Sequence, residues 1–217
     1  MTTIGTANGR RLTARGARTR AKIVAAAADV MNVQGVGGTT LDDVLAASGV
    51  SKSQLYHHFD GKPALVRAVI DCVGDRVLTR ERDALGRVST LAGLRRWRDA
   101  LVQNNALRHG SYGCSLGSLA SEVSDNDDLA RHTLAQLFGE WQSLLAEALK
   151  RLQDGGALPP DAPIDQLSIG LIGAVQGGYM LAQTARDVAP MATSIDMALA
   201  HIESLGSTQS GRRKWQV

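Results

Sequence analysis

A run of polar, cationic and aromatic residues near position 55 has the side-chain types that bind nucleic acid. Its members are Ser51, Lys52, Ser53, Gln54, Tyr56, His57 and, a little further along, Lys62. Hydroxyl and amide groups hydrogen-bond to base edges, and cationic groups bind phosphate oxygens. Leu55 and Phe59 interrupt the run with the spacing of one helical turn, so both can be buried while the polar side chains stay exposed.

Three short helices are needed to hold this polar face in place. Apolar residues with a period of 3.6 from Ile23 onward predict a first helix, and Gly35 to Gly38 predict a turn after it. Thr40 with Asp43 forms a capping box for a second helix, and Ser51 can cap a third. The predicted helices end near Gln34, Ser48 and Phe59. Two short helices joined by a turn at Gly49-Val50 have the layout of a helix-turn-helix.

The rest of the chain has further helical patterns and no strand pattern. These cover about residues 62–82, 90–109, 116–123, 127–153, 165–187 and 194–205. Only eight of the 217 residues are aromatic, so Ala, Leu, Val and Ile must form the core, and a β-sandwich is disfavoured. We expect an all-α fold with an N-terminal three-helix helix-turn-helix domain and a larger C-terminal helical domain.

The charge is unevenly distributed along the chain. Residues 1–62 hold eight Lys and Arg against four Asp and Glu, a net charge of +4, whereas the remaining 155 residues carry −1. This asymmetry is expected when one end binds a polyanion, although an incidental basic tail gives the same count. Lys62 and Pro63 begin a long helix whose N–H groups add an anion site.

The segment from Arg18 to Val69 resembles the TetR family of bacterial transcriptional repressors. The resemblance rests on the order Thr-Thr-x-x-x-Val-x-x-x-x-Gly-Val-Ser-Lys-x-x-Leu-Tyr-x-His-Phe-x-x-Lys-x-x-Leu, which begins at Thr39. It implies that Thr40 to Phe59 form the DNA-reading unit, with Lys52, Tyr56, His57 and Lys62 as phosphate contacts and Ser53 and Gln54 nearest the bases. Val44-Leu45 and Pro63 depart from the family pattern without removing a DNA contact.

Several residues of this region also have a purely structural interpretation. His58 is better explained as a packing or capping residue than as a DNA contact. Tyr56 could be half-buried, but its place in the third helix favours a phosphate contact. The arginines between Arg10 and Arg20 are either a solvated tail or an arm that follows the DNA backbone or minor groove.

The C-terminal part resembles a TetR subgroup that includes repressors of multidrug efflux genes. The resemblance rests on Gly113 to Glu122 and on Gly-Ala-x-Gln-Gly-Gly-Tyr-x-Leu-Ala from Gly173. It implies a pocket for a small-molecule effector, apolar or aromatic, although each candidate residue could instead be core. The candidates are Trp97, Leu101, Asn105, Cys114, Phe138, Trp141, Gln176 and Met180. Cys114 precedes a helix, so it could also be a redox switch.

Small residues on the helix expected at 165–187 can form a dimer interface. Gly170, Gly173, Ala174, Gly177 and Gly178 leave a shallow face that another helix can approach, within the chain or in a second copy. The resemblance favours a homodimer, because TetR dimers pair their last two long helices. The expected division is a flexible basic arm at 1–16, a DNA-binding domain at 17–77 with the helix-turn-helix at 40–59, an effector-binding and dimerisation domain at 78–205, and a flexible tail at 206–217.

Other functional classes find little support in the sequence. The five histidines include no i, i+4 metal pair, the two cysteines are 42 residues apart, and no acid, base and nucleophile are evidently grouped. We therefore expect no metal, no cofactor, no enzyme activity, no membrane segment and a cytoplasmic location. We expect a repressor that a small molecule releases from a palindromic operator in double-stranded DNA. A ligand-independent regulator or activator is the alternative, and a helical enzyme is a remote one.

Overall fold

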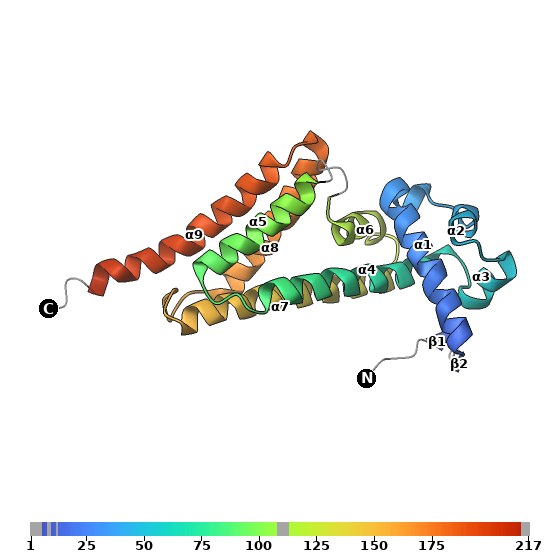
Figure 1. Cartoon of the computed structure of the whole chain (residues 1–217), viewed down its shortest axis with the longest axis horizontal. Helices are drawn as coiled ribbons and strands as arrows, with labels where there is room; N and C mark the ends of the chain where they lie inside the picture. Colours follow the sequence, from blue (N-terminus) through green and yellow to red (C-terminus); the bar gives the residue numbers. More distant parts are fainter. Residues whose placement is uncertain (1–5, 8–9, 12, 108–112, 214–217) are drawn as a thin grey trace. The chain divides into compact units, whose positions relative to one another are not determined.

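The computed structural model describes residues 6–7, 10–11, 13–107 and 113–213. Its helices are α1 (Ala14–Gly38), α2 (Leu41–Ser48), α3 (Lys52–His58), α4 (Lys62–Leu85), α5 (Leu91–Ala106), α6 (Ser115–Val123), α7 (Asp128–Asp154), α8 (Ile164–Ala185) and α9 (Ala189–Arg213), labelled in Figure 1. Strands β1 (Thr6–Ala7) and β2 (Arg10–Arg11) form one short antiparallel pair. The predicted all-α fold is confirmed, apart from this pair.

The chain forms two compact units. Unit 1 contains Met1–Arg76 and Ser115–Ala135, and unit 2 contains Val77–Cys114 and Gln136–Val217. Residues 115–135, which the sequence division placed with the effector-binding part, therefore group with the helix-turn-helix. The chain passes between the units within α4, before α6 and within α7.

In unit 1, helices α2, α3 and α6 pack against α1 (Figure 1). The α1 face that they cover is built from Ile23, Val24, Ala27, Ala28 and Met31, all buried at helical spacing. The helix is interrupted at Gly35, whose φ of 75° lies in the left-handed region that favours glycine. The break falls where the sequence predicts the end of the first helix.

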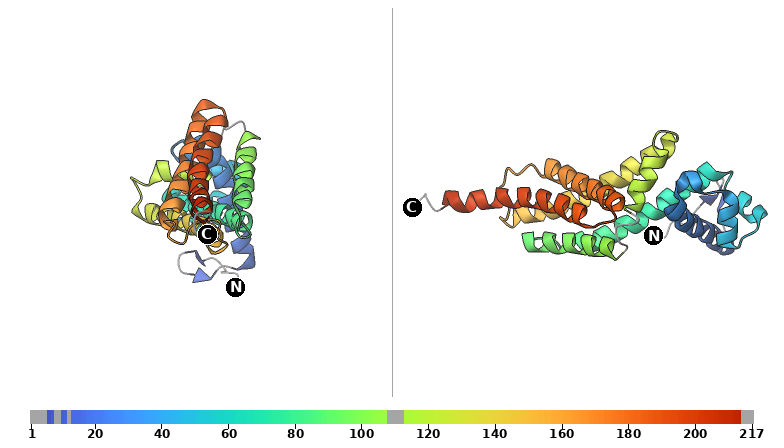
Figure 2. Two further views of the ribbon diagram at one scale, coloured as in Figure 1. Left: turned by 90° about the vertical axis from the view of Figure 1, so that its left-hand side faces the viewer. Right: turned by 90° about the horizontal axis from the view of Figure 1, so that it is seen from above.

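In unit 2, α9 packs along α8 and also contacts α5. Figure 2 shows α8 (orange) and α9 (red) from two further directions. Buried Leu171, Val175 and Ala182 of α8 and Met191 and Ile195 of α9 belong to the core of this unit. The core is mainly aliphatic, as the small number of aromatic residues requires.

Two predicted terminal segments are partly helical. α1 begins at Ala14 within the expected arm, because the Thr13 hydroxyl caps it by accepting a hydrogen bond from Gly16 N at 3.1 Å. α9 continues past the expected end at Leu205. Gly206 does not stop this helix but lets it pass the backbone of Ala157, whose carbonyl oxygen would collide with a Cβ at position 206. Positions 6–7 and 10–11 of the expected arm form the strand pair β1–β2, and its positions 1–5, 8–9 and 12, like residues 214–217 of the expected tail, lie outside the described residues.

Candidate nucleic-acid interface

Helix α2 is fixed at its start by a capping box. The Thr40 backbone N–H donates to Asp43 Oδ2 at 2.8 Å, and Asp43 N donates to Thr40 Oγ1 at 3.1 Å. The Thr40 hydroxyl also donates to Asp43 Oδ2 at 2.6 Å. The hydrogen bonds from the Thr40 side chain and backbone favour the charged carboxylate, so they hold the pKa of Asp43 below its usual value. The predicted cap is confirmed.

A tight turn at Gly49 joins α2 to α3. Gly49 has a φ of 62°, and its N–H donates to Leu45 O at 2.9 Å, closing α2. Ser51 then caps α3: Gln54 N donates to Ser51 Oγ at 3.3 Å, and Ser51 N donates to Gln54 Oε1 at 2.9 Å. The carbonyl oxygen of Gln54, a predicted base contact, is thus occupied by the cap. Its amide Nε2 remains available for a base acceptor.

Buried apolar residues hold the two short helices against their neighbours. Val44 of α2 and Leu55 of α3 are fully buried, as is Leu65 in the first turn of α4. Phe59 ends α3, and the Arg20 guanidinium lies 5.2 Å from the centroid of its ring. α3 therefore cannot rotate about its axis without exposing Leu55, and its outer face stays fixed.

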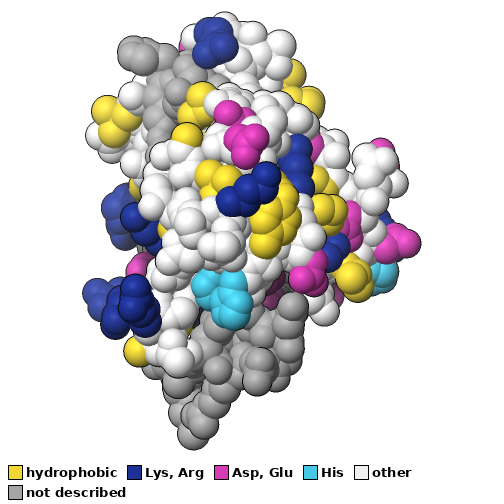
Figure 3. All heavy atoms as spheres, turned by 90° about the vertical axis from the view of Figure 1, so that its right-hand side faces the viewer, with side chains coloured by type: hydrophobic (Ala, Val, Ile, Leu, Met, Phe, Trp, Pro, Cys, Tyr) yellow, Lys and Arg dark blue, Asp and Glu magenta, His cyan; other side chains and the backbone are white. Residues whose placement is uncertain are grey.

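The outer face of α3 contains the residues that the sequence predicts as DNA contacts. Ser51, Lys52, Ser53, Gln54, Tyr56 and His57 are all exposed. Tyr56 is 46% exposed, so its ring and hydroxyl are accessible to a partner. In the view of Figure 3, Lys, Arg and His side chains project from the surface, interspersed with Asp and Glu side chains. Hydroxyl, amide, phenol and ammonium groups thus lie side by side on one short helix.

The two remaining candidates, Thr40 and Lys62, flank the helix-turn-helix. Thr40 is exposed at the start of α2. Lys62 begins α4 and is half-buried, and its Nζ donates to the Gly37 carbonyl oxygen at 3.4 Å. An ammonium group has three donors, so Lys62 can hold this carbonyl and still bind a phosphate.

His58 points inward, unlike its neighbour His57. It is buried, and its ring lies edge-on to that of His57 with centroids 5.1 Å apart. Burial is the main cause that lowers the pKa of His58, and the nearby positive groups of His57 and Arg20 lower it further. The structure thus agrees with the packing role that the sequence favours for this residue.

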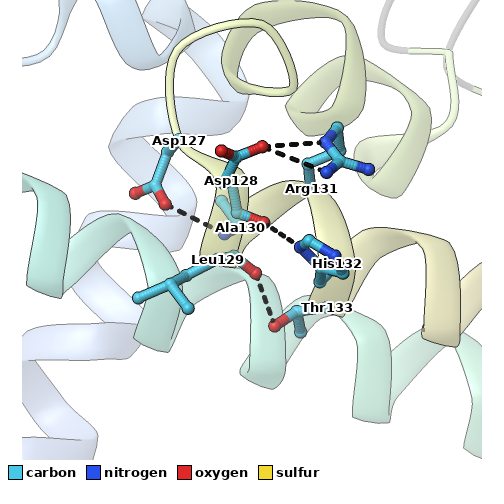
Figure 4. Close-up of polar contacts among 7 residues, drawn as sticks. All are labelled: Asp127, Asp128, Leu129, Ala130, Arg131, His132 and Thr133. Carbon is cyan, nitrogen blue, oxygen red and sulfur yellow. Dashed lines mark hydrogen bonds and ion pairs between the residues drawn. The ribbon is translucent and has the colours of Figure 1, made fainter.

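The start of α7 is tied to α4 within unit 1. Asp127 Oδ1 caps α7 by accepting from Ala130 N at 3.0 Å (Figure 4). Asp127 Oδ2 accepts from Arg67 of α4 at 2.7 Å. These hydrogen bonds, that from Ala130 above all, lower the pKa of the Asp127 carboxyl. One turn later, Arg131 pairs with Asp128 at 3.0 Å. The helix that contains the candidate phosphate contact Lys62 is therefore held by an ion pair as well as by its core.

Most of the candidate effector residues are buried in unit 2. Trp97, Leu101 and Asn105 follow one face of α5, Trp141 is fully buried on α7, and Cys114 is buried. Phe138 and Gln176 are half-buried. Three polar atoms of this set, Asn105 Oδ1, Trp141 Nε1 and Gln176 Nε2, are buried and have no hydrogen-bond partner among the described residues.

Glu81 is a buried acid that the sequence interpretation missed. Its side chain is 1% exposed, and its carboxylate accepts from Trp97 Nε1 at 2.9 Å and from Arg80 Nη2 at 2.9 Å. The signal was present in the sequence, because Glu81 lies one turn after Val77 on the buried stripe of α4. An acid on such a stripe requires buried donors.

Two predicted positions are corrected by the structure. Met180 is 63% exposed and does not lie in the interior with the other pocket candidates, because it shares the open face of α8 with Gly173 and Gly177. Gly178 faces inward instead, and a Cβ there would be 3.0 Å from Met191 Cα of α9. Gly178 therefore serves the packing of α8 on α9, whereas Gly170, Gly173 and Gly177 have open space beside them, and Ala174 is half-buried.

Comparison with known protein families places both parts of the chain. Residues 84–198 match the family described as Tetracyclin repressor-like, C-terminal domain, and residues 23–69 match Bacterial regulatory proteins, tetR family. The first match alone covers more than half of the chain. The chain belongs to the TetR family.

Proteins similar to this TetR-family chain are named as regulators. An uncharacterized HTH-type transcriptional regulator of Lactococcus lactis is 28% identical over 193 residues, covering 87% of this chain and 95% of the relative. The HTH-type transcriptional regulator LmrA of Bacillus subtilis is 26% identical over 174 residues, covering 79% and 90%. A TetR regulator structure from Chloroflexus aurantiacus has a TM-score of 0.77 at 25% identity, covering 88% and 96%.

These matches establish the general function. The chain is a transcriptional regulator of the TetR family that binds DNA through its helix-turn-helix, and it is not an enzyme. Members of the family bind DNA and form dimers. Among the described helices, none is both long and apolar enough to span a membrane.

Proposed function

We propose that this TetR-family chain is a repressor that binds a palindromic operator as a homodimer and is released by a small molecule. The observation that carries the proposal is the exposed face of α3, where six polar or amphipathic residues stand on a doubly capped helix. A seven-residue helix with this composition has no reason to be so well fixed unless its outer face must match a partner.

The roles within the operator complex follow from side-chain chemistry. Lys52 and Lys62 offer ammonium groups to phosphates, and beside them Tyr56 offers a hydroxyl group and His57 its ring nitrogens. Gln54, through its unoccupied amide, and Ser53 face the bases. Thr40 adds a hydroxyl at the start of α2. Phosphate contacts set the register and the two central residues select the sequence.

An exposed apolar surface on α8 and α9 supports the homodimer. Ile169, Met180, Leu181 and Met197 are all about half exposed or more, and Gly170, Gly173 and Gly177 leave open space along the same helix α8. Small residues let a second helix approach closely, and large apolar ones gain from burial. A two-fold dimer places its recognition helices about 34–36 Å apart, one turn of DNA.

The unpaired polar atoms of unit 2 support a ligand-binding role for that unit. A buried polar atom without a partner costs about 1–3 kcal/mol, so the three that belong to the candidate effector residues call for an explanation. A ligand with an aromatic or apolar body would pack on Phe138 and Trp141. Its acceptor groups would bind Trp141 Nε1 and Gln176 Nε2, and a donor group would bind Asn105.

Release requires the ligand to distinguish two states of the protein. A ligand shifts the protein away from DNA only if it binds the DNA-incompetent state more tightly than the competent one. We propose the functional limits expected from the sequence, 17–77 for DNA and 78–205 for the effector, with residues 115–135 of the second part packed in unit 1, and a site of action on cytoplasmic DNA.

A ligand screen with two readouts tests the proposal. Compounds that raise the melting temperature are added to the protein bound to fluorescent operator DNA, and anisotropy reports release. We expect at least one stabilising compound to weaken operator binding tenfold or more, which is a coupling of about 1.4 kcal/mol. Trp141→Phe, which removes the N–H donor, should lose the response but keep DNA affinity. Stabilising compounds that never change operator affinity would instead support a ligand-independent regulator.

A further inference from the structure

A carboxylate from α6 holds the turn that leads into the helix-turn-helix. Gly37 N donates to Glu122 Oε2 at 3.0 Å, although 85 residues separate the two along the chain. A Cβ built on Gly35, two residues earlier, would also lie 3.0 Å from the same oxygen. The carboxylate therefore lies directly against the break in α1, and both residues belong to unit 1.

The turn is held from its other side by a candidate DNA contact. Lys62 Nζ donates to Gly37 O at 3.4 Å, so an acid and a base bind the N–H and the carbonyl of the same residue. Thr39, which is buried, follows immediately, and its hydroxyl donates to Gly35 O at 2.7 Å. The next residue is Thr40, the cap of α2. A shift of Gly37 would consequently displace the first residue of the helix-turn-helix.

A second contact keeps α6 at this place on α1. Ser115 Oγ donates to Asn32 Oδ1 at 3.1 Å, and buried Leu116, Leu119 and Val123 form the apolar face of α6. Glu122 is otherwise exposed, and no ion pair involves it among the described residues. Solubility alone does not explain an acid at this position, because an acid in a DNA-binding unit opposes binding by charge repulsion.

We infer that Glu122 is a positioning residue for DNA binding, which fixes the Gly35–Gly38 turn and thereby the placement of α2 and α3. The inference uses only DNA binding by the helix-turn-helix and does not depend on a released or ligand-bound state. The negative charge of Glu122 and its hold on the turn predict opposite effects on DNA binding when Glu122 is replaced. Removing a negative charge should by itself tighten binding to all DNA, whereas loosening the turn should weaken binding to the operator alone.

Three variants separate the effect of the side-chain length at position 122 from the effect of its charge. Glu122→Gln keeps an acceptor oxygen at the same reach without charge, Glu122→Asp keeps the charge but is one methylene shorter, and Glu122→Ala loses both. Ser121→Ala, at an exposed neighbour on α6, is the matched control. Each variant is titrated against operator DNA selected from a random pool and against an unrelated duplex. Hydrogen exchange reports the protection of the Gly37 amide, and thermal melting confirms folding.

We expect Glu122→Ala and Glu122→Asp to weaken operator binding about five- to tenfold and to speed exchange at Gly37. Unrelated DNA should bind as tightly as before or more tightly, and Glu122→Gln and Ser121→Ala should stay within about twofold of the wild type. Operator affinity that is unchanged or raised in both Glu122→Ala and Glu122→Asp overturns the inference. An equal loss on both DNAs also overturns it. A wild type that prefers no sequence would instead contradict the proposed function.

Discussion

The two units of this chain place their candidate functional residues in opposite environments. On α3 of unit 1 and its cap Ser51, six candidates are exposed, and α2 and α3 are fixed by one capping box each and by a small apolar core. In unit 2, Trp97, Asn105 and Trp141 are buried, and two of these three side chains have an unpaired polar atom. On the proposed function, the site for a large polyanion is a rigid exposed face, whereas the site for a small molecule is built from buried groups that include unpaired hydrogen-bonding atoms.

The largest effect is expected on the free energy of unfolding, when the buried acid Glu81 is removed. Glu81→Ala leaves Trp97 Nε1 without its acceptor and Arg80 without its partner. Loss of one partner of a buried ion pair costs about 3–5 kcal/mol, and since Arg80 is half exposed we expect about 2–4 kcal/mol of unfolding free energy. Urea denaturation measures it, with exposed Glu147→Ala as the control. Equal stability of the two variants would show that the interior of unit 2 is not organised around Glu81.

A smaller effect concerns sequence selection on the exposed face. Gln54→Ala removes a proposed base contact and half of the α3 capping box. We expect discrimination between the best operator and its single-base variants to fall by about 1–3 kcal/mol at one position. Competition binding with a set of operator variants measures this. Loss of affinity that is the same for every sequence would place Gln54 on the backbone instead.

The next prediction concerns the phosphate contacts. Lys52→Ala should weaken binding to all sequences alike, because an ammonium group on a phosphate contributes through counterion release. The slope of log affinity against log salt should decrease by about one for each protomer site. Arg82→Ala, an exposed cation near the end of α4, should leave the slope unchanged. A slope that stays the same in Lys52→Ala would remove Lys52 from the interface.

The smallest effect is a pH dependence of unit 1. Burial lowers the pKa of His58 in the folded chain, so the unfolded chain binds the proton more readily. Stability is therefore complete above about pH 6.5, the ordinary histidine value, and decreases as the pH falls below it. His58→Leu should abolish this part of the pH profile in thermal melts between pH 7.5 and 5. A profile that is unchanged in this variant would assign the effect to another group.

The outer face of α3 was predictable from the sequence because the contacts that fix α2 and α3 are local. Thr40 with Asp43 and Ser51 with Gln54 act over three residues, and Gly49 alone sets the turn between them. The interior of unit 2 depends instead on contacts between distant helices. Nothing local tells that Glu81 meets Trp97, that Gly178 lies against Met191, or that Met180 faces outward on the same helix. For the same reason, the contact of Glu122 with Gly37 and the packing of residues 115–135 with unit 1 were not foreseen.

Selection of bound DNA from a random pool tests the central claim most directly. The account predicts an inverted repeat whose half-site centres are one helical turn apart, about 10 base pairs or a small multiple of that. The Gln54→Ala protein should select a repeat that has lost its preference at one symmetric pair of positions. Enrichment of no sequence, or of a motif that Gln54→Ala and Lys52→Ala leave unchanged in both preference and affinity, would contradict the account.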